Sequence, residues 1–262
     1  MANNQIRFND GAAYERYMGE WSQLAGKKFL DWLTPKLGLR WLDVGCGNGA
    51  FTEMLVQRCA PVSVDGIDPS EEQLAYAEER LSSSVARFRQ ANAMSLPFAD
   101  EAFDAAVMPL VIFFVPEPTK GVAEMARVVC PGGIVSAYAW DMSGAGFPYS
   151  ALQDEMRGMG VDVPVPPSGD ASGPDAMREL WAGAGLEGIE SFEINVERTF
   201  TDLDDYWTTI LCGPSVGPKL AAMSSEDLAT LKARMSELLP ADDDGRITYS
   251  SRANAIKGIV PE

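Results

Sequence analysis

Residues 41–50, Trp-Leu-Asp-Val-Gly-Cys-Gly-Asn-Gly-Ala, combine a short apolar run, one carboxylate and three glycines at alternate positions. A strand that runs through a glycine-rich turn into a helix brings backbone N–H groups and a helix N-terminus against a bound nucleotide-like ligand. Gly45, Gly47 and Gly49 permit positive φ and close approach of such a ligand, because they have no Cβ. Asp43 adds a carboxylate at the end of the strand. The segment therefore predicts a site for a nucleotide-like ligand.

The glycine turn by itself leaves the ligand open. Gly45-x-Gly47-x-x-Ala50 satisfies the relaxed dinucleotide fingerprint, and Asp68 lies near the ribose-binding position, roughly 20 residues further on. A dinucleotide therefore competes with other nucleotide-like ligands. A purely structural strand-to-helix turn is the remaining interpretation.

Charge narrows the class of partner. The chain has 262 residues and a net charge of −17, from 21 basic and 38 acidic residues. An acidic surface repels phosphate backbones and anionic membranes, so we expect neither a nucleic acid nor a membrane as partner. Arg87 and Arg89 come nearest to a basic cluster, and their alternation is typical of a solvated strand face.

Missing residue types exclude several chemistries. The chain contains no histidine, which rules out a Ser-His-Asp triad, a Cys-His pair, His-ligated metals and an imidazole base. The four cysteines, Cys46, Cys59, Cys130 and Cys212, show no Cys-x-x-Cys spacing, so no metal site is expected. Cys46 is interpreted as a small spacer in the turn. Reduced cysteines, no apolar run of 18 residues and a polar N-terminus favour a cytoplasmic protein.

The elements that must position these residues alternate along the chain. Strands are expected over 41–45, 62–67, 86–91, 103–108, 134–140, 187–198 and 247–259, the last as one strand or a pair. Helices are expected over 50–58, 70–81, 121–129, 149–159 and 174–184, with an interrupted helical stretch over 201–244. This alternation predicts an α/β fold with a doubly wound, mostly parallel, Rossmann-like sheet.

The expected organisation is a single domain over residues 1–262. Its core comprises about 25–140 plus 174–200 and 245–262, and a helical cap comprises about 1–24, 141–173 and 201–244. The Pro/Gly/Ser-rich loop 163–173 is expected to be either a lid over a site or a surface excursion.

Five segments between residues 41 and 140 occur in an order typical of one family. They are Leu42-Asp-Val-Gly-Cys-Gly-Asn-Gly49, Ile67-Asp-Pro-Ser70, Ala91-Asn-Ala-Met-Ser-Leu-Pro-Phe98, Phe103-Asp-Ala-Ala-Val107 and Arg127-Val-Val-Cys-Pro-Gly-Gly133. Together they resemble the class I S-adenosylmethionine-dependent methyltransferases of the small-molecule type. A nicotinamide oxidoreductase has no reason to carry the Leu-Pro-Phe and Pro-Gly-Gly segments, and no proton donor for one is evident.

The resemblance implies S-adenosyl-L-methionine as cofactor and S-adenosyl-L-homocysteine as product. The residues it implies for cofactor binding are Tyr14, Trp21, Asp43, Gly45, Cys46, Gly47, Asn48, Gly49, Asp68, Pro69, Asn92, Ala93, Met94 and Pro109. In this scheme the glycines lie against the methionine and ribose parts. Asp43 holds the turn and reaches the ammonium group through water, and Asp68 accepts hydrogen bonds from both ribose hydroxyls.

The same resemblance gives roles to residues further along. Asn92, where the family usually has Asp, meets the adenine amino group through its carbonyl oxygen, beside Ala93 and Met94. The backbone carbonyl of Pro109 faces the methionine ammonium group. Tyr14 and Trp21 belong to a leading helix and either cap the cofactor or pack its amphipathic face.

The implied reaction is direct in-line transfer of a methyl group to a small organic acceptor. Proximity and orientation supply most of such catalysis, and a general base is needed mainly for hydroxyl or carbon acids. Oxygen is the slightly favoured target, with nitrogen and carbon open. Asp141 is the first candidate base, followed by Glu117 and Tyr149, although each also fits a solvated or capping role.

The acceptor pocket is expected between the leading helix, residues 141–173 and the insert 201–244. Aromatic and apolar residues of the insert form either a cavity wall or the core of the cap, namely Phe200, Tyr206, Trp207, Ile210 and Leu211. The alternative function is a non-catalytic cofactor-binding protein of the same fold. The acceptor and the oligomeric state remain open.

Overall fold

The sheet determines the architecture of the protein. The computed structural model describes residues 15–81 and 85–262. Its strands are β1 (Arg40–Val44), β2 (Ser63–Asp68), β3 (Ala86–Gln90), β4 (Phe103–Pro109), β5 (Val129–Trp140), β6 (Glu187–Phe200) and β7 (Ile247–Ile259). Within these residues the strands form one sheet in the order β3-β2-β1-β4-β5-β7-β6. The pairings from β3 to β5 are parallel, whereas β7 runs antiparallel to both β5 and β6, which confirms the predicted mostly parallel α/β fold.

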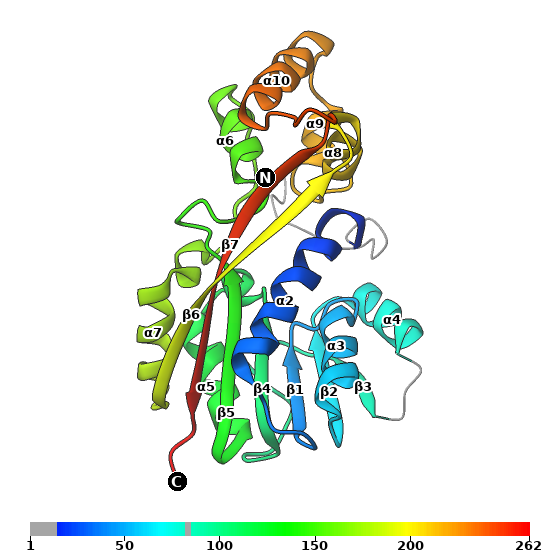
Figure 1. Ribbon diagram of the computed structural model, residues 1–262. Helices are drawn as coiled ribbons and strands as arrows, with labels where there is room; N and C mark the ends of the chain where they lie inside the picture. The colour runs from blue at the N-terminus through cyan, green and yellow to red at the C-terminus, as the bar shows by residue number, and fades with distance from the viewer. Residues whose placement is uncertain (1–14, 82–84) are drawn as a thin grey trace.

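Helices cover both faces of this sheet. They are the π-helical turn η1 (Glu15–Gly19), α2 (Glu20–Leu33), α3 (Ala50–Cys59), α4 (Glu71–Arg80), α5 (Pro118–Val128), α6 (Ser150–Gly158), α7 (Pro174–Gly183), α8 (Leu203–Ile210), α9 (Gly217–Ala221) and α10 (Ser225–Leu238), with 3-10 turns η2 (Ile112–Phe114) and η3 (Gly169–Ser172). Figure 1 shows α2 and α3 in front of the sheet and α5 behind it. None of the described helices is long and apolar enough to cross a membrane.

Local sequence explains the central elements. Trp41, Leu42 and Val44 of β1 are completely buried, as expected for a parallel strand covered on both faces. Ser70 caps α4 by accepting a hydrogen bond from the backbone N–H of Gln73 at 3.2 Å. The glycine turn consequently lies between a buried strand and a helix, at the carboxyl edge of the parallel strands.

A group of helices, α6, α8, α9 and α10, forms a cap above that edge, and β6 and β7 extend into it (Figure 1). Phe200, Tyr206, Trp207 and Ile210 are at most 5% exposed, and the rings of Phe200 and Tyr206 lie 5.3 Å apart. Leu211 is 46% exposed. Of the two interpretations that the sequence left open, Phe200, Tyr206, Trp207 and Ile210 therefore fit the core of the cap, whereas Leu211 lies on its surface.

Some boundaries differ from those expected, and one alternative that the sequence left open is decided. β5 begins at Val129 and includes Pro131-Gly-Gly133. A Cβ on Gly133 would come within 2.7 Å of the Asp104 carbonyl oxygen, so β4 and β5 approach closely there. The register between these two strands also shifts at this place. Residues 247–259 form one continuous strand. Helix α2 runs unbroken across residue 24 and lies against β6, to which Lys28 donates a hydrogen bond at the Asn195 carbonyl oxygen.

Candidate functional site

The glycine turn adopts the conformation that its composition predicts. Gly45, Gly47 and Gly49 have φ values of +77°, +52° and +78°. A Cβ on Gly45 would come within 2.4 Å of Val111, and one on Gly49 within 3.0 Å of Ala77. At Gly47 the nearest atom to such a Cβ would be 3.9 Å away. Gly45 and Gly49 are therefore required by packing as well as by φ, whereas Gly47 leaves the inner edge of the turn open.

Asp68 ties the turn to the end of β2. Its Oδ2 accepts a hydrogen bond from the Gly47 N–H at 3.0 Å, and its Oδ1 accepts one from the Ser70 N–H at 2.9 Å. The side chain is half-buried, and burial raises the pKa of its carboxyl group above the ordinary value. Each oxygen keeps a lone pair, so the carboxylate can still accept hydrogen bonds from a diol.

Asp43 lies beneath the same turn and is completely buried. Its Oδ2 accepts a hydrogen bond from Thr52 Oγ1 at 2.6 Å, while its Oδ1 has no hydrogen-bond partner among the described residues. Burial, with a contribution from the nearby charge of Asp68, raises the pKa of Asp43 to about 7. A buried, partly unsatisfied carboxylate beside a second one makes this end of the site suited to a ligand that carries positive charge.

The turn after β3 holds the next candidate residues. Asn92 is exposed, and its Oδ1 accepts a hydrogen bond from the Met94 N–H at 2.8 Å. Ser95 N–H donates to the Asn92 carbonyl oxygen at 3.0 Å, and Ala93 and Met94 are half-buried. The amide oxygen expected to meet adenine thus already has one partner inside its own turn.

Pro109 ends β4, and the chain bends sharply after it. Leu110 has a φ of +60°, a left-handed conformation that costs a non-glycine residue about 1–2 kcal/mol. Its N–H donates to the Tyr138 carbonyl oxygen at 2.7 Å. The bend brings the next residue, Val111, against Gly45, while Leu110 itself lines a neighbouring pocket. Backbone strain is thereby concentrated between the glycine turn and that pocket.

Two of the predicted turn residues have structural roles. Cys46 is buried, and burial raises the pKa of its thiol well above the ordinary value, which agrees with a spacer. Asn48 is also buried and donates from Nδ2 to Glu15 Oε2 at 3.1 Å. Pro69 is exposed beyond the end of β2.

Glu15 is a residue that sequence reasoning missed. Besides Asn48, its Oε2 accepts a hydrogen bond from Arg80 on α4 at 2.9 Å. Glu15 thereby joins the leading helical segment to the glycine turn. The only sequence signal was its position beside Tyr14 in a segment already singled out for its aromatic residues. Thr52, the partner of Asp43, was missed as well, although its place in the first turn of α3 was evident.

Of the two roles that the sequence left open for the leading aromatic residues, the structure bears on that of Trp21. Tyr14 lies outside the described residues. Trp21 is completely buried, with its ring 6.4 Å from that of Trp140 and 5.1 Å from that of Tyr249. Because no part of the ring is accessible, Trp21 packs the core and does not cover a ligand in this structure.

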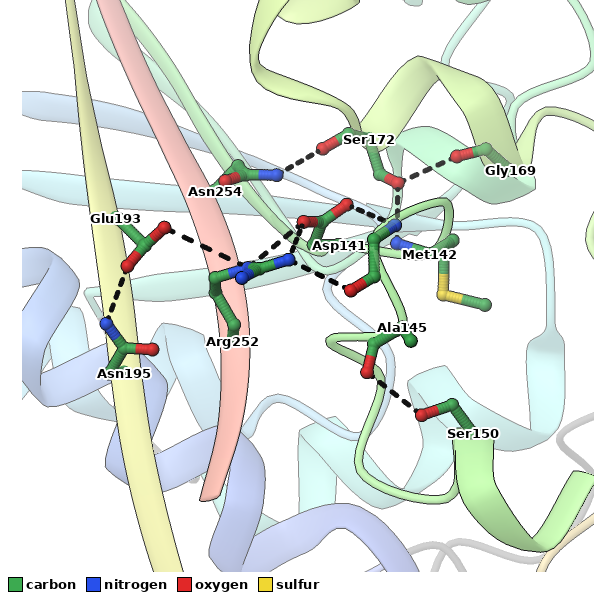
Figure 2. A network of polar contacts seen from close by, with 11 residues as sticks. Asp141, Met142, Ala145, Ser150, Gly169, Ser172, Glu193, Asn195, Arg252 and Asn254 are labelled. Carbon is green, nitrogen blue, oxygen red and sulfur yellow. Dashed lines mark hydrogen bonds and ion pairs between the residues drawn. The ribbon is translucent and has the colours of Figure 1, made fainter. Parts of the chain in front are cut away.

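Asp141 is not placed to act as a base, which contradicts the expectation (Figure 2). Its Oδ2 accepts hydrogen bonds from Arg252 Nε at 3.1 Å and Nη2 at 2.7 Å, and its Oδ1 accepts one from the Gly144 N–H at 2.9 Å. The residue is 6% exposed. Asp141 therefore fixes the loop after β5 to β7, because both carboxylate oxygens are engaged in structure.

The other two candidate bases are also engaged elsewhere. Glu117 is exposed and pairs with Lys120 at 2.7 Å. Tyr149 is completely buried, stacks on Tyr17 at 4.4 Å and donates its hydroxyl to the Tyr17 carbonyl oxygen at 2.6 Å. Burial raises the pKa of the Tyr149 phenol above its ordinary value, which keeps it protonated.

An apolar pocket lies beside Leu110. Its walls come from the leading helix, the end of β4, the segment after β5 and the insert after β6. They comprise Tyr17, Met18, Leu110, Phe113, Phe114, Trp140, Met142, Phe147, Gln153, Pro164, Pro166, Pro214 and Ser215. Loop 163–173 contributes Pro164 and Pro166, so part of this loop borders the pocket. None of the wall residues that the structure describes carries a formal charge.

Comparison with known proteins decides the family. A family model described as a methyltransferase domain matches residues 42–137. A demethylmenaquinone methyltransferase of Desulfitobacterium hafniense is 37% identical over 114 residues, 42% of this chain and 45% of the relative. A phosphatidylethanolamine N-methyltransferase of Cereibacter sphaeroides is 41% identical over 111 residues, 40% of this chain and 53% of the relative. Residues 42–137 therefore form a methyltransferase domain of the class I S-adenosylmethionine-dependent type.

Solved methyltransferases share the fold. A phosphoethanolamine N-methyltransferase of Haemonchus contortus, in complex with S-adenosyl-L-methionine, superposes with a TM-score of 0.60 at 20% identity, over 96% of this chain and 56% of that chain. The chain spans about half the length of the two curated relatives named above. The region matched by the methyltransferase model contains the glycine turn, Asp43, Asp68 and Pro109 but none of the cap. The matched region also contributes Leu110, Phe113 and Phe114 to the pocket wall, whereas the other wall residues lie outside it.

Proposed function

We propose that this methyltransferase transfers a methyl group from S-adenosylmethionine to a small organic acceptor by direct in-line transfer. The observation that carries the proposal is the bend after Pro109. One side of it, Val111, lies against Gly45 of the glycine turn, and the other side, Leu110, lines the apolar pocket. Cofactor and acceptor would thus meet across a single strand end, which is what transfer between two bound molecules requires.

The residues fit the cofactor. Asp68 would accept hydrogen bonds from the ribose hydroxyls, and the open backbone at Gly47 would lie against the chain of the methionine part. The unsatisfied Oδ1 of Asp43 supports binding of a cationic group at this end, directly or through water. When bound, the cofactor supplies a methyl group already activated by a positively charged sulfur. The protein then has to orient the acceptor, exclude water and keep both molecules in line.

We do not propose oxygen as the favoured atom for methylation. Methylation of a neutral hydroxyl needs a base, and each of the three candidates, Asp141, Glu117 and Tyr149, is engaged elsewhere. The same observation favours the alternative of a cofactor-binding protein without turnover. Tight binding of the cofactor with no methylation across a broad acceptor panel would support that alternative.

The first experiment is calorimetric titration of the protein with S-adenosylmethionine, S-adenosylhomocysteine and NAD. We expect binding of both sulfur ligands and none of NAD. Asp68→Asn should weaken binding roughly 10- to 100-fold, because a hydrogen bond to a charged group contributes about 1.5–3 kcal/mol. Asp175→Asn, at an exposed position on α7, is the matched control and should bind normally. Failure of the wild type to bind either sulfur ligand would refute the proposed function.

A further inference from the structure

The acceptor pocket has an unusual composition for a site that must recognise a polar reactant. Five of its thirteen wall residues are aromatic, namely Tyr17, Phe113, Phe114, Trp140 and Phe147. Among the described residues, the wall contains no carboxylate, ammonium or guanidinium group, and its only ionisable side chain is the phenol of Tyr17. Gln153 and Ser215 supply its side-chain amide and aliphatic hydroxyl.

Charged groups behind the wall are paired with one another. Arg157 donates to Gln153 Oε1 at 3.3 Å and pairs with Asp154 at 2.8 Å. Arg198 pairs with Glu20 at 2.9 Å and reaches the Tyr17 carbonyl oxygen at 3.5 Å. Next along the chain to wall residues are Asp141, paired with Arg252, and the exposed Arg16.

An anionic acceptor does not match this pocket. A phosphate or carboxylate that enters an apolar site needs a cation or several donors, because desolvation of its charge is otherwise uncompensated. Arg157 and Arg198, whose side chains contact wall residues, already have carboxylate partners. The pocket therefore favours an acceptor without a negative charge.

A neutral hydroxyl does not match it either. Its oxygen becomes a strong nucleophile only as its proton leaves, and no carboxylate or other general base lines the pocket within residues 15–81 and 85–262. An amine differs because its free base carries a ready lone pair. An apolar environment also favours the neutral form of an amine over its ammonium form. Removal of the proton can therefore take place in water, before the amine enters.

The aromatic wall suits the product of such a reaction. Transfer moves the positive charge from sulfur to nitrogen, and aromatic faces attract methylated ammonium groups without any carboxylate. The net charge of −17 also favours an amine as acceptor, because it raises the concentration near the protein of amines that are cationic in solution.

Resting on the proposed function, we infer that the acceptor is an apolar amine that binds as its free base in the pocket beside Leu110 and is methylated on nitrogen. The nitrogen lone pair forms the new N–C bond, the C–S bond breaks, and its electron pair stays on sulfur as a neutral thioether. The nitrogen becomes cationic, and the product leaves as an alkylammonium ion; the one proton released to water per turnover is the one that the amine loses before it enters. Gln153 and Ser215 are positioning residues at the polar part of the wall.

A set of acceptors on one skeleton tests the class. With S-adenosylmethionine, 2-phenylethylamine should be methylated at least tenfold more efficiently than 2-phenylethanol or phenylalanine, and phosphoethanolamine should not react. Better methylation of the alcohol, phenylalanine or phosphoethanolamine would overturn the inference while leaving the proposed function in place. Methylation of none of the four, with the cofactor bound, would also overturn the inference.

Proton release provides a readout that does not depend on turnover. 2-Phenylethylamine is almost fully protonated at pH 7, so binding as the free base must release about one proton per molecule. We would titrate it into the complex with S-adenosylhomocysteine in buffers of different ionisation enthalpy. Release of about one proton is expected, and binding without proton release would show that the ammonium form binds and would overturn the inference.

A carboxylate placed in the wall should reverse this behaviour. Gln153→Glu should let the ammonium form bind, which abolishes proton release and lowers kcat/KM at pH 7 at least tenfold. Ala151→Glu adds the same charge on the exposed face of the same helix, α6, and should behave as the wild type. Ser215→Asp repeats the test from another wall if Gln153→Glu does not fold. Unchanged proton release in a folded wall variant would contradict the inference.

Discussion

At the scale of single residues, Asp43 shows how a site for a cation is prepared. Its carboxyl group is fully buried under the glycine turn, with the Thr52 hydroxyl on one oxygen and no partner among the described residues on the other. Burial raises its pKa from 3.8 to about 7. The residue that suits a positively charged ligand therefore destabilises the fold whenever that ligand is absent and the group is ionised.

The pH dependence of stability should reveal this residue. Between about pH 4 and 7 the unfolded chain has lost the Asp43 proton while the folded chain retains it, so the contribution of Asp43 to stability falls as pH rises through this window. Asp43→Asn removes the effect. Relative to the wild type, the variant should gain stability progressively across the window, by about 4 kcal/mol in total, since one pKa unit corresponds to about 1.4 kcal/mol.

Urea unfolding of ligand-free protein at several pH values would measure this difference in stability between Asp43→Asn and the wild type. The exposed Asp175→Asn should show no such trend. A difference between Asp43→Asn and the wild type that stays constant with pH would contradict the assigned burial effect.

At the scale of elements, the site depends on the loop that follows β5. Asp141 holds this loop to β7 through Arg252, and the loop carries Met142 and Phe147 into the pocket wall. A residue that first resembled a catalytic base thus acts as an anchor for the acceptor pocket. The cofactor side of the site is built independently, on β1, β2 and the turns that follow them.

The variant Asp141→Ala distinguishes a role as anchor of the loop from a role as general base. Loss of an anchor should lower the free energy of unfolding by about 1–3 kcal/mol and raise KM for the acceptor, because Arg252 loses its partner and the loop is released. It should leave kcat within a fewfold and binding of S-adenosylhomocysteine unchanged. Loss of a general base would instead reduce kcat about 100- to 10,000-fold with little effect on stability.

Denaturant unfolding and steady-state kinetics would distinguish the outcomes. Asp31→Ala breaks the exposed pair with Arg58 and should cost less than about 1 kcal/mol. Equal destabilisation by the two variants would argue against the anchoring role of Asp141.

At the scale of the whole molecule, segments far apart in sequence converge on the carboxyl edge of the sheet. The cap reaches this edge through β6 and β7, and the leading helical segment reaches it through Glu15 (Figure 1). Glu15 is shared by Asn48 of the glycine turn and Arg80 of α4. The leading segment is therefore coupled to the cofactor side of the site as well as to the pocket, which Tyr17 and Met18 line.

Glu15→Ala should expose this coupling. We expect a loss of about 1–2 kcal/mol in stability and a severalfold weaker affinity for S-adenosylhomocysteine, because Asn48 and Arg80 lose a shared acceptor. Glu53→Ala is the matched control, since Glu53 contacts the same Arg80 at 3.5 Å and has no contact with Asn48. Calorimetry and urea unfolding measure the two effects. Equal affinities in the two variants would refute the coupling.

Much of the fold and of the cofactor side was predictable because the signals there are local. Alternating apolar runs and helical periods identify strands and helices, and glycines before a helix identify the turn, since positive φ is a property of single residues. Asp68 was predictable for the same reason, because it follows a strand directly and lies at the edge where parallel strands end. The packing of Trp21 in the core was not predictable, because an aromatic residue on an amphipathic helix has the same pattern whether it faces a ligand or the core.

The sequence by itself therefore determined the α/β architecture, the methyltransferase motifs and the position of the glycine turn. Only the tertiary structure decided that Asp141 is paired with Arg252, that Glu15 binds Asn48, and that an uncharged aromatic pocket lies beside Leu110. Arg252 is 111 residues from Asp141 along the chain, and the pocket wall comes from four separate segments. Local patterns show that a side chain is polar or apolar, but its partner is set by how distant elements pack.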